Sequence, residues 1–312
     1  MTGCDRNDDK QDKTLIANGD PEKRRNTSNE TKKTWYQTVN WVADDFFEDR
    51  VVVDLCKAIE RDDTAKVEQL ISDGVDVNAL GKGRMTPLLW ALPDGKLVQF
   101  ERLIDAGADP NVIVTSDFHS RGIIHAGHSV THLAAGARDF GFLRKVIDSG
   151  CDPNIRDTYT EDSVLHTVIQ SPVDDKIQRV KLLIENGADL DAMSSVDATP
   201  VILAVRFGRQ YDVALLLLDA GANPFIYGRR WNKKLIHAVV EQEQLHGQFT
   251  ENARRDYDLI VSKLVDAGES VERARSDLER WSMWLRSYEP SKVAKLRKAE
   301  REKLISEGKM NR

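Results

Sequence analysis

A short motif built around glycine recurs six times along this 312-residue chain and constrains its fold more than any other feature. The clearest copies are Asp-Gly-Val-Asp-Val-Asn at 73–78, Ala-Gly-Ala-Asp-Pro-Asn at 106–111, Ser-Gly-Cys-Asp-Pro-Asn at 149–154 and Asn-Gly-Ala-Asp-Leu-Asp at 186–191. The six glycines are Gly74, Gly107, Gly150, Gly187, Gly221 and Gly268, spaced by 33, 43, 37, 34 and 47 residues. Such a period indicates stacked structural repeats, which usually bind partners rather than catalyse reactions.

A second motif precedes each glycine, and its clearest copy is Thr-Pro-Leu-Leu-Trp-Ala at 86–91. Its copies begin at Val53, Thr86, Ser129, Ser163, Thr199 and Lys234. Together the two motifs resemble the ankyrin repeat, whose signature is Thr-Pro-Leu-His-x-Ala with a period near 33 residues. The resemblance covers roughly residues 53–272, and the first and last copies lack Thr-Pro, as is typical of capping repeats.

The residue chemistry of the motifs agrees with this resemblance. Thr or Ser can cap the start of a helix, and Pro fits the first helical position. Glycine ends a second helix because φ > 0 is easiest for a residue without a Cβ. We therefore expect an all-α fold, a solenoid of about six helix-turn-helix repeats with finger loops and a helical cap at each end. The expected divisions are 1–34, a disordered polar tether; 35–52, an N-terminal capping helix; 53–275, the repeats; and 276–312, the C-terminal helices.

Two insertions break the period. About ten extra residues lie in the second finger loop, Val112–His128, and the sixth repeat carries extra residues at Glu241–Asp258. Insertions in repeat arrays map to loops, often on the binding face. They are also tolerated as drift, because lengthening a surface loop costs little.

Apolar residues at helical spacing predict a helix at 35–48 that covers the open face of the first repeat. The alternative is a helix lying on a membrane surface, which its acidic residues oppose. At the other end, Ser276-x-x-Glu279 has the pattern of a capping box and predicts a helix start. The apolar side that follows either packs on the last repeat or presents tryptophans to a partner; it comprises Leu278, Trp281, Trp284, Leu285 and Tyr288.

Composition and the apolar pattern argue against some partners. The net charge of −6 argues against nucleic acid, no apolar run is long enough to cross a membrane, and we expect a monomer. Three cysteines predict no disulfide framework.

Met1-Thr2-Gly3-Cys4 resembles the end of a bacterial lipoprotein signal, although the apolar stretch that should precede it is absent. Cys4 is therefore a predicted lipidation site, which would place the protein at the periplasmic side of a bacterial envelope; the alternative is a cytoplasmic protein.

We expect no cofactor and no catalytic centre. His132, His166 and His237 occupy the histidine position of the repeat, where the resemblance implies a structural role tying neighbouring loops. His119, His125 and His128 lie near Asp117 in the first insertion, and could instead bind zinc in a metal-dependent enzyme. Their spacing matches no metal-site signature.

The resemblance implies that the inner helices and finger tips hold a protein partner. Interface anchors are typically Trp, Tyr and Arg, and basic and aromatic residues gather at the predicted finger tips and one helix turn of this acidic chain. The predicted partner-binding residues are Phe118, Arg121, Arg156, Tyr159, Arg206, Phe207, Arg209, Tyr227, Arg229, Arg230 and Trp231. In the alternative, Trp231 packs on the second insertion and the arginines pair with local carboxylates. We predict a non-enzymatic protein that holds one protein partner in its concave face through an acidic surface of that partner. The alternative is an inhibitor or immunity-type protein that blocks a partner enzyme.

Overall fold

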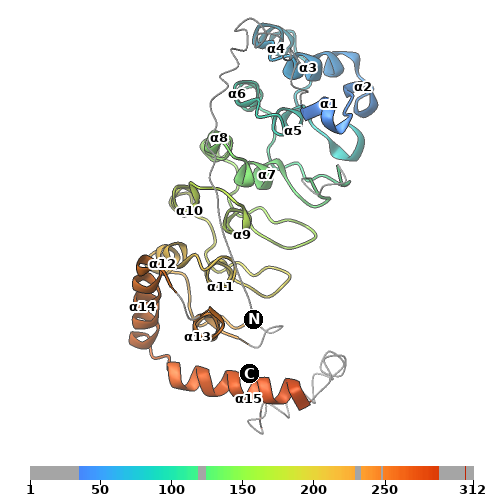
Figure 1. The fold of residues 1–312 in the computed structure, drawn as a ribbon. Coiled ribbons are helices and arrows are strands. Elements are labelled where there is room, and N and C mark those ends of the chain that lie inside the picture. The colour runs from blue at the N-terminus through green and yellow to red at the C-terminus, as the bar shows by residue number, and fades with distance from the viewer. Residues whose placement is uncertain (1–34, 119–123, 229–232, 247–248, 288–305, 307–312) are drawn as a thin grey trace, which may run out of the picture.

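In a computed structural model, the described residues are 35–118, 124–228, 233–246, 249–287 and 306. They form a curved stack of antiparallel helix pairs (Figure 1). Six pairs make the six repeats: α3 (Arg50–Glu60) and α4 (Thr64–Ser72), α5 (Pro87–Ala91) and α6 (Leu97–Asp105), α7 (Val130–Gly136) and α8 (Phe140–Asp148), α9 (Val164–Gln170) and α10 (Lys176–Glu185), α11 (Pro200–Arg206) and α12 (Tyr211–Asp219), and α13 (Leu235–His246) and α14 (Glu251–Asp266). Two short helices, α1 (Trp35–Val39) and α2 (Ala43–Phe46), precede them, and α15 (Val271–Ser287) follows. The expected all-α repeat solenoid is confirmed.

The repeat motifs form the local structures that their residues favour. Gly107 has a φ of 87°, and a Cβ placed on it would meet no atom within 4 Å, so the backbone conformation and not crowding selects glycine there. At the helix starts, Thr86 Oγ1 accepts a hydrogen bond from the Leu89 amide at 3.1 Å. Thr199 makes no such bond among the described residues, so Pro200 and apolar burial define the start of α11 without a side-chain cap.

Two asparagines of the glycine motif, Asn78 and Asn154, join neighbouring repeats. Asn78 Nδ2 donates to the Gly107 carbonyl at 2.9 Å, and Asn78 Oδ1 accepts from the Asp109 amide at 2.8 Å. Asn154 makes the same pair of bonds with Gly187 and Asp189, at 3.0 and 2.6 Å. Each bridge fixes one turn against the next, so the same residues that open a turn also stack the repeats.

The apolar core runs along the whole stack between inner and outer helices. Arg179 on α10 is buried in it, and its guanidinium donates to the carbonyls of Ala134, Ala135 and Arg138, and forms a 2.5 Å ion pair with Asp175. Since those carbonyls lie at the C-terminal end of α7 and just beyond it, this side chain supplies the hydrogen bonds that a helix end otherwise lacks.

Several predicted helix boundaries are wrong. The segment 35–48 is not one helix, because Asn40 adopts a φ of 54° after α1 and the chain restarts at α2. The extra residues at 241–258 lengthen α13 and α14 and do not form one long loop. Ser276 lies inside α15, which begins at Val271, where Ser270 Oγ accepts from the Arg273 amide at 3.1 Å.

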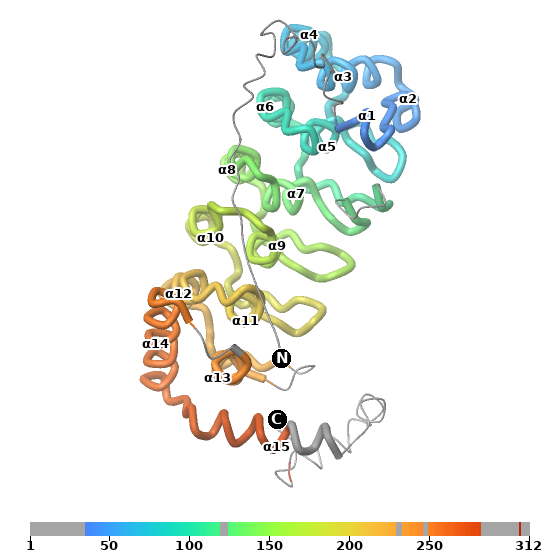
Figure 2. The backbone as a smooth tube through the Cα atoms, viewed as in Figure 1, coloured from blue at the N-terminus to red at the C-terminus, as the bar shows by residue number. Residues whose placement is uncertain are grey.

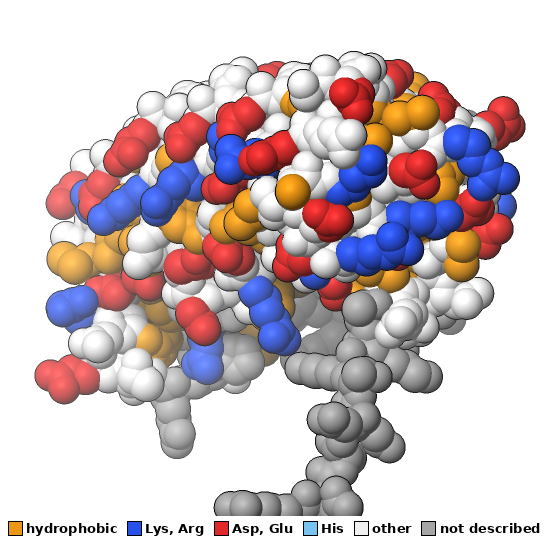
Figure 3. Space-filling view, turned by 90° about the horizontal axis from the view of Figure 1, so that it is seen from above, with side chains coloured by type: hydrophobic (Ala, Val, Ile, Leu, Met, Phe, Trp, Pro, Cys, Tyr) orange, Lys and Arg blue, Asp and Glu red, His pale blue; other side chains and the backbone are white. Residues whose placement is uncertain are grey.

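The end of the stack formed by the first repeat has a mixed, largely polar surface (Figure 3). Seen from the end formed by the first repeat, charged side chains of both signs are interspersed and hydrophobic ones are scattered (Figure 3). Such a polar outer face is what a terminal repeat needs for solubility. No helix among the described residues has the length and apolar character needed to cross a membrane.

Candidate partner-binding site

The inner helices α3, α5, α7, α9, α11 and α13 and the finger loops line one concave side of the stack (Figure 2). Each finger loop precedes an inner helix, so the loops project from the same edge. Backbone hydrogen bonds link successive loops: Thr115 N to Gly83 O at 3.0 Å, Thr158 N to Gly127 O at 3.3 Å, and Ser195 N to Thr160 O at 2.8 Å. The first four finger loops therefore form a continuous, mutually supported wall beside the inner helices.

The repeat histidines hold the loops to the helices, as expected. His166 Nδ1 lies 2.8 Å from Ser163 Oγ at its own helix start, and its Nε2 lies 2.9 Å from the Ala198 carbonyl in the next repeat. His132 makes the equivalent contacts with Ser129 and the Asp162 carbonyl. Burial lowers the pKa of His132 to about 4, so it is neutral near pH 7. His237 instead faces Asp277 on α15 at 3.5 Å, which places α15 where a seventh repeat would begin.

The segment 35–47 lies on the concave side and not, as predicted, over the open face of the first repeat. The Tyr36 ring stacks on Trp90 of α5 at 5.4 Å between centroids, and Tyr36 Oη donates to the Trp90 carbonyl at 2.6 Å. Trp41 also contacts Trp90, at 5.2 Å between ring centroids. The Trp35 amide donates to Asp94 Oδ1 at 3.0 Å, in the turn between α5 and α6. This segment therefore fills the concave face of the second repeat.

Phe118 is a wrong prediction as an exposed partner-binding residue. It is only 6% exposed, with its ring 5.9 Å from Trp41 and 5.8 Å from Phe46. The first insertion thus uses Phe118 to pack against the N-terminal segment. The sequence shows an aromatic residue in a loop, but it does not show that a distant apolar segment lies over that loop.

Two predicted residues, Arg156 and Tyr159, lie together on the third finger loop. Tyr159 is 83% exposed, although its loop is well held: Asp157 Oδ1 accepts from the amides of Tyr159 and Thr160 at 2.8 and 2.6 Å. Arg156 donates to the carbonyls of Glu161 and Met193, so the alternative that arginines bond to local groups applies to it. A fixed loop thus presents an exposed aromatic ring.

The remaining predicted residues are not all brought to this place. Phe207 is 55% exposed but follows α11, at the opposite end of that seven-residue helix from its finger loop, about 10 Å away. Arg206 and Arg209 flank it, and Tyr227 is half-buried on the fifth finger loop. Outside the described residues lie Cys4, Arg121, Arg229, Arg230 and Trp231.

The histidines of the first insertion do not assemble a metal site within the described part of the chain, which omits His119. His125 Nδ1 lies 3.8 Å from Asp117, whose Oδ1 accepts from the Ala126 amide. His128 Nε2 lies 3.5 Å from the buried Asp157, and burial lowers the pKa of His128. The contacts of Asp117 hold the second finger loop in itself, and the contact between His128 and Asp157 braces it against the third.

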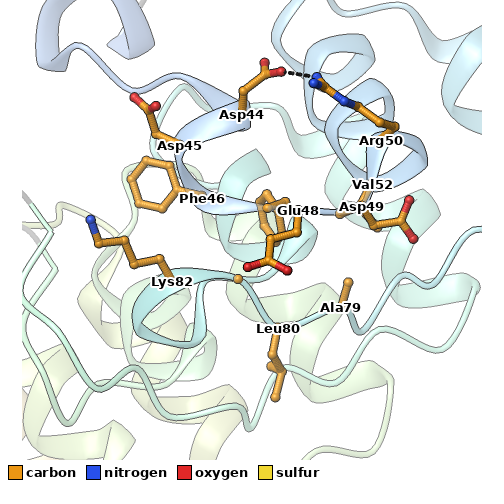
Figure 4. A pocket seen from close by; sticks show the side chains of 12 residues that line it. Asp44, Asp45, Phe46, Glu48, Asp49, Arg50, Val52, Ala79, Leu80 and Lys82 are labelled. Atoms are coloured by element: carbon orange, nitrogen blue, oxygen red, sulfur yellow. Dashed lines mark hydrogen bonds and ion pairs between the residues drawn. The ribbon is translucent and has the colours of Figure 1, made fainter.

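Two hollows on this side of the molecule are not evident from the sequence. One, of about 880 Å³, lies between α2, the start of α3 and the first finger loop (Figure 4). Carboxylates of Asp45, Glu48 and Asp49 lie among its lining side chains, whereas Asp44 is paired with Arg50 at 2.6 Å and Lys57 at 2.7 Å. The hydrogen bond from Lys57 lowers the pKa of the Asp44 carboxyl.

The second hollow is a groove of about 660 Å³ on the concave face of the second to fourth repeats, here called the palm groove. Its apolar lining side chains include Leu92, Ile124, Leu133, Ala137, Phe142 and Pro172. No sequence pattern predicts the palm groove, because its residues come from three repeats and one insertion.

The comparisons with known proteins agree with this geometry. Residues 131–227 match the family of ankyrin repeats, in three copies. An ankyrin repeat protein of fowlpox virus is 25% identical over 47% of this chain, and one of Acanthamoeba polyphaga mimivirus is 30% identical over 26%. The human neurogenic locus notch homolog protein 1 is 31% identical over 43%. The matched regions span 20%, 50% and 5% of these three proteins.

Among solved structures, the ankyrin repeat domain of Bcl-3, a member of the IκB protein family, superposes with a TM-score of 0.53. It is 24% identical to this chain and covers 69% of it, and the match spans 86% of that domain. At this identity the likeness concerns the fold. The chain carries ankyrin repeats, and its described residues form an ankyrin-repeat solenoid, a fold whose general use is protein–protein interaction. The relatives named above are viral or human, so a bacterial source stays a prediction.

Proposed function

We propose that this protein is a non-enzymatic binding module that holds a protein partner between its inner helices and its finger tips. The observation that carries the proposal is Tyr159, an aromatic side chain 83% exposed on a finger loop that is fixed by Asp157 and by the neighbouring loop. Because the loop backbone is already fixed, little backbone conformational entropy is lost on binding, and tyrosine is enriched among interface anchors.

The test is affinity capture with the full-length protein from the cells that make it. Wild type is compared with Arg156→Ala/Tyr159→Ala and with the Arg229→Ala/Arg230→Ala/Trp231→Ala variant, which tests the fifth finger loop. A matched control is Leu259→Ala on α14, which removes an exposed hydrophobic side chain from an outer helix. A partner kept by wild type and the control but lost by either finger variant supports the proposal. Identical partners on all four baits contradict it.

We further propose that Cys4 is lipidated, which would anchor the protein at a membrane of a bacterial envelope. The motif Met1-Thr2-Gly3-Cys4 is the support for this proposal. Mass spectrometry of the N-terminal peptide from native protein tests it: an acylated Cys4 supports it, and an unmodified Cys4 behind Met1 contradicts it.

Assay of any captured enzyme with and without this protein tests the inhibitor alternative.

A further inference from the structure

One position of the repeat, four residues after the start of the motif, faces the concave side. Trp90, Leu133, Thr167 and Leu203 occupy it in the second to fifth repeats. Trp90 and Leu203 are buried, whereas Leu133 and Thr167 are half-buried. Since the four residues have the same place in the repeat, the difference lies in what covers them. Along this row the concave face is open at the third and fourth repeats.

The palm groove lies over this open stretch, since Leu133 and Thr167 both line it. Phe142 and Ile124 are almost fully buried in its floor. A volume of about 660 Å³ is in the range of sites that enclose a ligand group. Side chains of a partner that entered the groove would therefore be removed from water against an apolar surface.

The palm groove is continuous with the contact that covers Trp90. Asp94 lines the groove and also accepts the hydrogen bond from the Trp35 amide. The adjoining N-terminal segment shows what this surface accommodates: aromatic rings stacked on the inner helix, with one hydroxyl donating to a helix carbonyl. One repeat further along, the same row of the concave face is also apolar, and there Leu133 is half-buried beside the groove.

The charged groups around the groove select against a strongly charged occupant. Asp94 is already bonded to the Trp35 amide and lies 3.5 Å from Lys96 Nζ. Asp139 accepts from the Gly141 amide at 2.7 Å as a helix cap, and Arg138 is the basic residue in the same lining. Since acidic and basic groups are balanced at the edges and the floor is apolar, hydrophobic burial provides the driving force for binding there.

We propose that the palm groove is the docking site for a short apolar segment of a protein partner, which places an aromatic or branched aliphatic side chain over Leu133. The inference rests on the proposed function and names the partner's chemistry and the part of the concave face that takes it. The partner segment would extend the row that Tyr36 and Trp41 begin on Trp90.

The experiment uses a phage-displayed library of random twelve-residue peptides, selected on the full-length protein. Enriched peptides are then synthesised and titrated against wild type, Leu133→Lys, Thr167→Lys and Arg156→Ala/Tyr159→Ala. The two lysine substitutions place a charge in the groove from different helices, so both would have to misfold to mimic a binding defect. Circular dichroism and thermal unfolding of each variant identify any that lose the fold.

We expect enriched peptides to share an aromatic or branched aliphatic residue, and each lysine variant to bind them at least tenfold more weakly. Equal affinity for wild type and both folded lysine variants overturns the inference, as does selection of no peptide or of acidic or basic peptides without a shared apolar residue. Peptides that depend on Arg156 and Tyr159 but not on Leu133 overturn the palm groove and leave the proposed function standing. If Arg156→Ala/Tyr159→Ala loses a native partner that both lysine variants keep, the palm groove is likewise overturned and the proposed function stands.

Discussion

The second and third repeats build the concave face from the same motif but present it differently. In the second, Trp90 lies under the rings of Tyr36 and Trp41; in the third, Leu133 at the same position is half-exposed beside the palm groove. Residues 35–47 thus act as a built-in ligand for the second repeat. A repeat's place in the array, and not its motif, therefore decides whether its inner surface belongs to the core or to a binding site.

The largest effect is expected where the concave face is filled. Trp90→Ala removes from α5 a fully buried ring that packs against Tyr36 and Trp41. It should lower the free energy of unfolding by about 3–5 kcal/mol. Chemical denaturation followed by circular dichroism measures it. A loss below about 1 kcal/mol would mean that the N-terminal segment does not pack on α5. Tyr159→Ala, at an exposed site, is the control and should change stability by less than about 0.5 kcal/mol.

The two repeats also differ at the histidine position, where the second has Leu89 and the third has His132. The pKa of His132 falls from 6.5 in the unfolded chain to about 4 in the folded one. Between pH 6.5 and about pH 4, His132 is therefore protonated in the unfolded chain and neutral in the folded one. This difference stabilises the folded state fully above pH 6.5. As the pH falls toward 4, about 3 kcal/mol of the free energy of unfolding is lost.

Replacing His132 with Leu, the residue of the second repeat, tests this difference. Unfolding free energies measured at pH 7 and pH 4 should differ less in His132→Leu than in wild type. His125→Leu, which changes a half-exposed loop histidine, is the matched control for the removal of an imidazole. If wild type and His132→Leu lose stability equally on acidification, the imidazole of His132 is not the group responsible.

In the third repeat, hydrogen bonds from Arg179 hold the C-terminal end of the inner helix α7. Arg179→Ala leaves the carbonyls of Ala134, Ala135 and Arg138 without their buried donor, and should lower the free energy of unfolding by about 2–3 kcal/mol. Exchange of amide hydrogens should accelerate most in α7 and α8. Unchanged protection there would show that the helix end is stable without the guanidinium.

The smallest effect concerns the bridges between turns. Asn154→Ala removes two hydrogen bonds between repeats and should cost about 1–2 kcal/mol in thermal or chemical unfolding. Asn111, at the same place in the second repeat, has an Oδ1 with no hydrogen-bond partner in the described structure. The loss in Asn111→Ala should therefore be smaller. Equal losses would mean that the bridge contributes nothing specific at Asn154.

The sequence predicted the repeat order, the helix pairs and the structural histidines correctly, because each depends on neighbouring residues. It predicted Tyr159 as exposed for the same reason: a polar loop between two motifs lies on the surface. It failed for Phe118, which is buried by Trp41 and Phe46 from a segment more than 70 residues away. The palm groove was missed since no contiguous stretch contains it.

Local sequence accounts for the repeat itself: glycine favours a positive φ at each turn, Thr, Ser and Pro begin helices, and a regular period makes the helix pairs stack. Contacts between distant segments are needed to explain which surface the apolar residues 35–47 cover and why residues 241–258 lengthen two helices. Helical spacing shows that a segment has an apolar side. The surface that receives it depends on shape and burial between distant segments, and the hydrophobic effect that drives this burial has no direction of its own.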